Sequence, residues 1–308
     1  MSLARPEVAV VGNIGIDTNV YLPGEDIDWN VEANFTENLD YVGQAGGYAS
    51  RGYAQLGFRT TFIGSVGDDF GGRQIREELA QDRIDTTALF LDPAGTSRSV
   101  NIMYRDGRRK NFYDAKSHMS LRPDLELCRK ALTGCRLAHF NIPNWARGLL
   151  PVAKELGVTV ACDLQDLVDA RDPYRQDFIR HADILFFSAV NHGDPAPLMR
   201  EFLQGHPDRI VVSGMGPKGC ALGTKAGIRL FPPEPMDLPI IDTNGAGDGL
   251  AVGFLSSYVL GGFSLAESIR RGQIVARYTC ALRGSTSGMI SSEQLEHFFQ
   301  VAQAGSRS

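Results

Sequence analysis

The chain has 308 residues, 43% of them hydrophobic, which is enough for one large core or for a core with an appendage. Its net charge of -5 does not suggest a nucleic-acid-binding surface, and no apolar run reaches the length of a membrane span. No signal-peptide pattern is present, and the odd number of widely spaced cysteines favours reduced thiols (Cys128, Cys135, Cys162, Cys220 and Cys280). We therefore expect a cytoplasmic protein without nucleic-acid or membrane partners.

The first strand is predicted at 7–11, where a short valine-rich apolar run ends at Gly12-Asn13. Asp17 follows shortly afterwards. A carboxylate just past the first strand lies where open α/β sheets bind ligands, although a turn aspartate is the alternative interpretation. Alternating residues at 18–21 and 37–42 then predict short strands of a small sheet outside the main core.

A helix is predicted to open at Gln44-Ala45-Gly46-Gly47-Tyr48 and to end at Gly57. The two glycines Gly46 and Gly47 would let the backbone come close to a small ligand, or would serve only as flexible capping. A polar-faced helix is predicted next, at 71–81.

The next signal is a hairpin, because alternating runs at 97–104 and 110–113 flank the turn dipeptide Asp106-Gly107. Three consecutive basic residues lie beside this turn (Arg108, Arg109 and Lys110). They could attract an anionic ligand, or they could form an ordinary solvated turn.

From residue 137 onward, apolar strands alternate with helices. Strands are predicted at 137–141, 158–162, 184–187 and 210–213, and helices at 145–156, 174–181 and 197–203. This alternation favours a parallel sheet with right-handed crossovers. A capping box at Ser264 and Glu267 begins a later helix.

The stretch with the most chemistry is Asp242-Thr243-Asn244-Gly245-Ala246-Gly247-Asp248. It follows an extended segment and runs into a helical apolar stripe at 249–261. Amide groups on a first helical turn have no intrahelical partner, so an anion can approach them there. A carboxylate at Asp248 is expected to be ionised at neutral pH and able to accept a proton. An ordinary tight connection, with Asp248 as a helix-start residue, is the alternative.

The full seven-residue string closely resembles the signature of the ribokinase-like (PfkB) carbohydrate kinases. The similarity continues at Gly46-Gly47 and through 56–71, and it covers nearly the whole chain. It implies an α/β fold with a three-layer α/β/α core, a mainly parallel sheet and a small β-sheet lid. The chain would then be a single domain over 1–308, with the lid formed by about 17–43 and 97–114.

The resemblance also implies site roles. Asp248 would be the catalytic base, and the amides of Gly245, Ala246 and Gly247 an anion hole for the phosphate in transfer. Asp17 and the Gly46-Gly47 pair would hold a sugar-like acceptor, with ATP as donor and Mg2+ on its phosphates. A closed lid would exclude water, which otherwise competes as acceptor.

Further positions follow from the resemblance on the nucleotide side. The loop at Gly216, Lys218 and Gly219 would lie beside the phosphates, although Lys218 could be a plain exposed lysine. The loop near Gly284 would wall the adenine pocket. In similar proteins, the aspartate matching Asp242 and this loop can also hold a monovalent cation such as K+, whereas Asp242 could simply cap the turn.

Three residues, in two segments of the chain, depart from the family pattern. Arg51 is placed where the family has a sugar-binding asparagine, and a guanidinium there would suit a carboxylate or phosphate on the ligand, unless it is a surface arginine. Ser188 and Asn191 occupy the positions of the family's Asn-x-x-Glu motif. Both side chains are neutral, so this motif contributes no negative charge to a magnesium site.

Several alternatives stay open at this stage. The acceptor could be an adenosine-like nucleoside, and the neutral Ser188 and Asn191 motivate a nucleotide- or sugar-binding regulator that has lost catalysis. A dinucleotide-dependent oxidoreductase is disfavoured, because no Gly-x-Gly-x-x-Gly follows the first strand. A homodimer through the lid is a further expectation, since the small sheet leaves one face to be covered.

Overall fold

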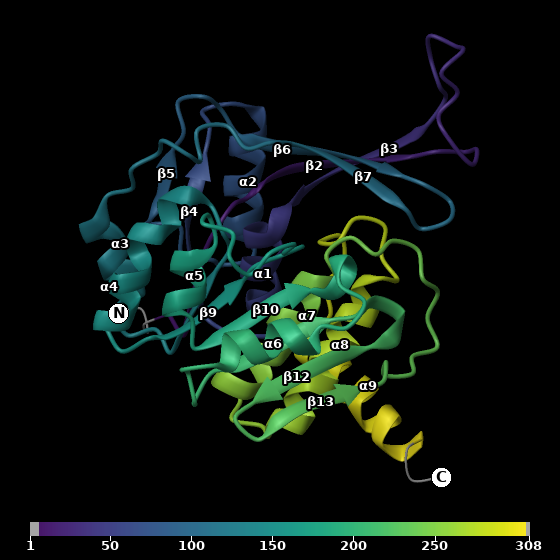
Figure 1. Ribbon diagram of the computed structural model, residues 1–308. Coiled ribbons are helices and arrows are strands. Elements are labelled where there is room, and N and C mark those ends of the chain that lie inside the picture. Colours follow the sequence, from purple (N-terminus) through teal and green to yellow (C-terminus); the bar gives the residue numbers. More distant parts are fainter. Residues whose placement is uncertain (1–5, 306–308) are drawn as a thin grey trace.

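The computed structural model describes residues 6–305, which form two separate sheets (Figure 1). The larger sheet has nine strands in the order β13-β12-β11-β10-β9-β8-β1-β4-β5. The strands from β11 to β5 run parallel, and β12 and β13 extend one edge antiparallel. Their bounds are β1 Val8–Val11, β4 Thr60–Val66, β5 Leu89–Leu91, β8 Leu137–Phe140, β9 Thr159–Asp163, β10 Ile184–Ser188, β11 Ile210–Gly214, β12 Cys220–Thr224 and β13 Gly227–Phe231.

Helices cover both faces of the large sheet. Side chains alternate along a strand, so Val8 and Val10 of β1 enter one core while Ala9 and Val11 enter the other. A strand covered on both faces is apolar throughout, which explains the unbroken valine-rich run. The first core holds α1 (Gln44–Gln55), α2 (Phe70–Gln81), α7 (Ala246–Leu255), α8 (Leu265–Thr279) and α9 (Ser292–Gly305), and the second holds α3 (Leu125–Leu132), α4 (Leu150–Glu155), α5 (Gln176–His181) and α6 (Ala196–Leu203). The predicted three-layer core is confirmed.

The smaller sheet has the strand order β3-β2-β6-β7 and extends away from the main body in Figure 1. Its strands are β2 (Gly15–Tyr21), β3 (Glu37–Gly43), β6 (Ser97–Met103) and β7 (Arg109–Asp114). The predicted hairpin at Asp106-Gly107 joins β6 to β7, and Gly107 has a φ of 85°, as such a turn requires. We call this second unit the small sheet.

Some elements differ from the sequence prediction. The helix predicted at 145–156 begins as a 3-10 segment, η1 (Asn144–Leu149), before α4, because Pro151 lacks the N–H that would continue a regular helix across the junction. The helix that carries the apolar stripe at 249–261 begins at Ala246, in line with the prediction that Asp248 lies on its first turn, but it ends in a π-helical segment, η4 (Ser256–Leu260). The capping box at Ser264 is present.

Two broader expectations can be compared with residues 6–305. No helix there is both long enough and apolar enough to cross a bilayer. All five cysteines have free thiols, four of them buried.

Candidate active site

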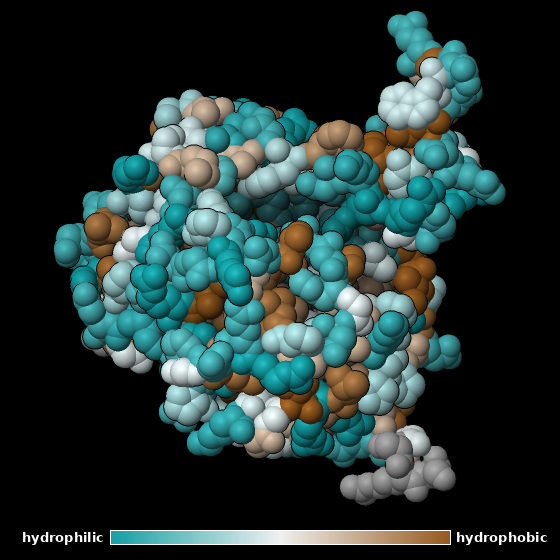
Figure 2. Space-filling model, viewed as in Figure 1, coloured by the Kyte–Doolittle hydropathy of each residue, from teal (hydrophilic) through white to brown (hydrophobic). Residues whose placement is uncertain are grey.

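The carboxyl ends of the parallel strands form one edge of the large sheet, where polar residues gather. Asn141 directly follows β8 and Asp163 ends β9, and the register of these neighbouring strands sets the two residues side by side. Both side chains are buried. Figure 2 shows the surface hollowed beneath the small sheet. Open parallel sheets bind ligands outside the carboxyl ends of their strands.

The start of α7 presents free amide groups. Gly245 precedes the helix with a φ of 78°, a left-handed conformation that favours glycine. Its amide and that of Gly247 donate to no protein atom within residues 6–305. Ala246 differs, because its amide donates to the carbonyl of Thr243 at 3.3 Å. Of the three amides predicted for an anion hole, those of Gly245 and Gly247 are therefore available without breaking a bond.

Asp248 lies in the first turn of α7 and is half-buried. Burial is the main cause that raises the pKa of its carboxyl group to about 8. The neighbouring Asp163 and Asp17 contribute to this rise, and Arg109 opposes it. This raised pKa runs against the expectation that Asp248 is fully ionised at neutral pH. Burial destabilises the ionised carboxylate by more than the nearby Arg109 stabilises it.

Asp17 lies on β2 with its side chain on the face of the small sheet that is turned toward α7. It is only 5% exposed, and one carboxylate oxygen, Oδ2, accepts a hydrogen bond from the amide of Gln44 at 3.0 Å. The other oxygen, Oδ1, is buried and accepts no hydrogen bond of ordinary geometry within residues 6–305, although the Ser99 hydroxyl lies close enough to lower the pKa of this carboxyl group. Burial raises the pKa of Asp17 to about 6. A buried oxygen without a hydrogen bond of ordinary geometry is unusual, and it marks a place for a donor from a ligand.

The predicted glycines Gly46 and Gly47 lie inside the first turn of α1, where both are buried. A Cβ atom on Gly46 would lie 2.4 Å from the carbonyl oxygen of Asn13, and one on Gly47 would lie 3.0 Å from Ile14. Close packing of α1 against the β1–β2 connection therefore accounts for both glycines. The Gly46 amide already donates to Asn13 O at 2.8 Å.

Arg51 does not join this site. Its guanidinium group forms ion pairs with Glu78 and Asp82 of the α2 region, each at 2.6 Å. Two carboxylates already pair with its Nε and Nη1 atoms, which argues against the predicted recognition of an anionic acceptor by Arg51. The residue lines a separate cavity of about 390 Å³, which neither Asp17 nor Asp248 lines.

Two further residues belong to this site. The sequence interpretation named Arg109 only as one of three basic residues that could attract an anion, and it did not name Asp163. Arg109 of β7 donates to the side-chain oxygen of Asn244 and lowers the pKa of both Asp17 and Asp248. Asp163 is a third carboxyl group, with its pKa raised by burial, and it acts on Asp248. A signal for Asp163 was present, because it directly follows the predicted apolar strand at 158–162.

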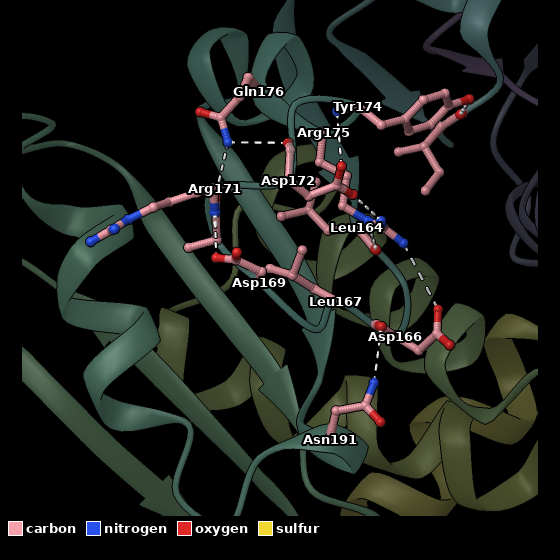
Figure 3. A network of polar contacts seen from close by, with 12 residues as sticks. Leu164, Asp166, Leu167, Asp169, Arg171, Asp172, Tyr174, Arg175, Gln176 and Asn191 are labelled. Carbon is pink, nitrogen blue, oxygen red and sulfur yellow. Dashed lines mark hydrogen bonds and ion pairs between the residues drawn. The ribbon is translucent and has the colours of Figure 1, made fainter.

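The neutral pair Ser188 and Asn191 lies at the end of β10 and in the adjoining 3-10 turn η2 (Ala189–Asn191). The Asn191 amide donates to the carbonyl of Asp166 at 3.1 Å, and Figure 3 shows it pointing toward that loop. The same loop is held by Arg175, which pairs with Asp172 and donates to the carbonyl of Leu164 at 3.1 Å. Asn191 thus fixes a neighbouring loop in the chain without ligands.

The remaining predicted nucleotide positions lie in two loops. Gly216 and Lys218 belong to the turn η3 (Gly216–Lys218) after β11, and Lys218 is exposed. Gly219 follows with a φ of 88°, and a Cβ there would lie 2.1 Å from the carbonyl of Phe231. Gly284 has a φ of 78° and packs beside Leu39 and Tyr41 of the small sheet.

Asp242 is buried, and both of its carboxylate oxygens have partners. Oδ2 accepts from the Asn19 amide at 2.8 Å and from the Tyr21 hydroxyl at 3.2 Å, while Oδ1 accepts from the backbone amide of Asn244 at 2.7 Å. No group of three or more histidine, cysteine or acidic side chains within residues 6–305 is arranged to hold a metal ion. The contacts of Asp242 in this structure therefore join the small sheet to the loop before α7.

A family model described as pfkB family carbohydrate kinase matches residues 5–143 and 152–292 of this chain. The chain belongs to this family.

Relatives within and around the family agree with this placement. The acarbose 7(IV)-phosphotransferase of Actinoplanes sp. is 28% identical over 92% of this chain and 95% of its own length. The 5-dehydro-2-deoxygluconokinase of Geobacillus thermodenitrificans is 26% identical over 96% of this chain and 93% of its own. Among solved structures, a microbiome-derived acarbose kinase superposes with a TM-score of 0.88 at 27% identity, covering 96% of this chain and all of that one.

These relatives are named as phosphotransferases that act on sugars and sugar-like molecules. The chain is accordingly a carbohydrate kinase, a phosphotransferase with an alcohol group as acceptor. The site described above has the parts that such a reaction needs, namely carboxylates beside free amides at a helix start.

Proposed function

We propose that this kinase transfers the γ-phosphoryl group of ATP to a hydroxyl group of a sugar-like acceptor, with Asp248 as the general base. The observation that carries the proposal is the position of Asp248. Its carboxyl group lies on the same helical turn as the free amides of Gly245 and Gly247 and is electrostatically coupled to Asp17. An acceptor hydroxyl between these groups would meet a base, an anion-binding loop and an orienting carboxylate together.

In the chemical step, Asp17, Asp248 and the free amides each have one role. Asp17 Oδ1 accepts a hydrogen bond from the acceptor and so orients it. The reacting hydroxyl gives its proton to the Asp248 carboxylate, its oxygen bonds to the γ-phosphorus, and the bond from that phosphorus to the bridging oxygen breaks to release ADP. The amides of Gly245 and Gly247, with Arg109 close by, stabilise the negative charge that develops on the phosphoryl oxygens. A base with a raised pKa is well matched to proton removal near neutral pH.

ATP binding would involve the neighbouring loops. We assign Gly216, Lys218 and Gly219 to the phosphate side and Gly284 to the adenine side, with Ser188 and Asn191 between them. Mg2+, when bound with the nucleotide, would neutralise phosphate charge. Ser188 and Asn191 bring no charge to it, so Asp163, buried at the end of the neighbouring strand, is the carboxylate we assign to the metal side of the site.

The acceptor class follows from the relatives and from the buried Oδ1 oxygen of Asp17. Proteins named for acarbose, 5-dehydro-2-deoxygluconate and fructoselysine are among the curated relatives. All of these acceptors carry several hydroxyl groups, which suits a site with carboxylate acceptors. A panel of acarbose-like pseudo-oligosaccharides, keto acids of sugars, amino-acid-linked sugars and nucleosides, assayed for ADP release, would identify the class.

The test of the assignment is Asp248→Asn. This variant keeps the shape of the side chain but removes the base, so we expect ADP release to fall by a factor of about 100 or more while ATP binding, measured by calorimetry, is retained. Asp237→Asn is the matched control, because Asp237 is exposed and makes no side-chain hydrogen bond or ion pair with the described residues. Undiminished turnover in Asp248→Asn would overturn the assignment. A wild-type chain that binds ATP and acceptor without releasing ADP would favour the regulator hypothesis.

A further inference from the structure

A row of asparagine side chains crosses the small sheet on the face turned toward α7. The register pairs Asn19 of β2 with Asn101 of β6, and Asn101 with Asn111 of β7. Asn111 donates to Asn101 at 2.8 Å, and Asn101 donates to Asn19 at 3.0 Å. Asn19 is fully buried and Asn101 is 2% exposed. Buried amide side chains persist in a fold when their hydrogen bonds are made, so this row is a defined structural unit.

The row ends on the loop that forms the anion site. Asn19 donates to Asp242 at 2.8 Å, although the two residues are 223 positions apart in the chain. The other oxygen of Asp242 accepts from the backbone amide of Asn244, the residue just before Gly245. The Asn244 side chain is also held by the small sheet, because its amide donates to Tyr41 at 2.8 Å and its oxygen accepts from Arg109.

The anion site is therefore attached to the small sheet as well as to the core. The core holds this loop through two backbone hydrogen bonds, which the amides of Ile241 and Asp242 donate to the carbonyl of Cys280. One further backbone bond lies within the turn at 243–246. The conformation of Asn244 decides where the Gly245 amide points. The small sheet holds Asn244 by hydrogen bonds, so a movement of the sheet will also move the amides of Gly245 and Gly247.

On the basis of the proposed function, we propose that Asn19 and Asp242 are positioning residues that couple closure of the small sheet to the geometry of the anion site. Neither residue touches the reacting atoms. When the sheet is closed over an acceptor, Asn19 holds Asp242, and Asp242 holds the Asn244 amide, so Gly245 and Gly247 point at the phosphoryl group. When the sheet opens, this support is lost and the loop relaxes.

The test exchanges the donor and the acceptor of the hydrogen bond between Asn19 and Asp242. Asn19→Asp alone sets two carboxylates against each other, and Asp242→Asn alone leaves one N–H group without an acceptor in either orientation of the amide. We expect each single variant to lose kcat by a factor of about 10 to 100, with ATP affinity within about twofold of wild type, because a misplacement of about 1 Å can cost that much. The double variant restores a donor opposite an acceptor, with the bonds from Asn101 and Asn244 retained, and should recover most of kcat.

Thr18→Val is the control for a general weakening of the small sheet. Thr18 alternates with Asp17 and Asn19 on β2, so it lies on the opposite face, and its hydroxyl donates to Asp40. We expect this variant to keep the wild-type kcat. A purely structural role for Asn19 would lower the melting temperature of the single variants and leave kcat unchanged below the melting transition, which would overturn the proposal.

Amide hydrogen exchange of residues 242–249 gives a readout that does not depend on turnover. Exchange there should be at least fivefold faster in each single variant than in wild type, and slow again in the double variant. Failure of the double variant to restore protection, in a folded chain, would refute the coupling. Absence of ADP release from wild type with every acceptor would refute the proposed function instead, and the exchange result would still decide the coupling.

Discussion

Asp17 carries a buried charge whose cost can be measured. It is only 5% exposed, and burial raises its pKa from 3.8 to about 6, although the Gln44 amide opposes this. The shift of roughly two pH units corresponds to about 3 kcal/mol at 1.36 kcal/mol per unit. Ionised Asp17 therefore lowers the free energy of unfolding by about 3 kcal/mol.

The sign of the pH dependence follows from the direction of the shift. Folded Asp17 binds its proton more tightly than the same residue does in the unfolded chain, because its folded pKa is the higher one. The penalty is thus fully present above pH 6, and it disappears as the pH falls from about 6 toward 3.8. Asp17→Asn keeps an oxygen for the Gln44 amide and removes the charge. We expect the variant to gain about 1–3 kcal/mol in free energy of unfolding at pH 8 and nothing at pH 4.

The same variant should lose function. A hydrogen bond to a charged acceptor contributes about 1.5–3 kcal/mol, so Asp17→Asn should lower kcat/KM for the acceptor by a factor of about 10 to 150. Denaturant unfolding at both pH values, together with ADP-release kinetics at pH 8, tests the two effects. A variant that is less stable at pH 8, or equally stabilised at both pH values, would show that the charge of Asp17 carries no such cost. Asp237→Asn, an exposed change of the same kind, should alter neither quantity.

Further predictions concern the other groups of the site. Arg109→Gln removes the cation that lowers the pKa of Asp248, so kcat should fall by a factor of about 10 to 100. In a plot of kcat/KM against pH, the acidic limb should move to higher pH. An acidic limb that stays in place would refute the electrostatic role of Arg109. In wild type that limb reports loss of the Asp248 base as the pH falls through a pKa well above that of an ordinary carboxyl group, which a pH–rate profile will show. Gly245→Ala should cost about 1–3 kcal/mol of stability, measured by thermal unfolding, because the φ of 78° is strained for alanine and its Cβ would lie 2.6 Å from that of Ser285; a neutral effect would contradict this.

The parts of the site that lie close together in sequence could be predicted. Gly245, Gly247 and Asp248 belong to one helical turn, so a local pattern is enough to bring a carboxylate and free amides together. Asp163 follows the general rule on the ends of parallel strands, whereas Asp17, to which the sequence interpretation applied that rule, lies within β2 of the small sheet. The layered core was predictable for the same reason, because alternation and apolar runs are local signals.

The rest of the site depends on packing between distant segments. The family resemblance placed Arg51 near the acceptor, but packing between elements decides what a helical side chain meets, and Arg51 lies against Glu78 and Asp82 of the α2 region. Arg109 reaches Asn244 across 135 positions of sequence. No local pattern contains such a pairing. The alternation of polar residues along β2, with Asp17 and Asn19 on one face, is a signal that the small sheet would have a polar inner side.

The groups that we assign to acceptor recognition, proton transfer and anion binding meet at the interface between the small sheet and the core. The small sheet supplies Asp17, Asn19 and Arg109, whereas the core supplies the loop from Asp242 to Asp248. Burial of Asp248 raises its pKa, and Arg109, carried by the small sheet, lowers it, so the strength of the base depends on where the sheet lies. Groups that act as one unit give non-additive losses when they are removed. Arg109→Gln combined with Asn19→Asp should therefore lower kcat by less than the product of the two separate effects, since each change already separates the small sheet from the anion site.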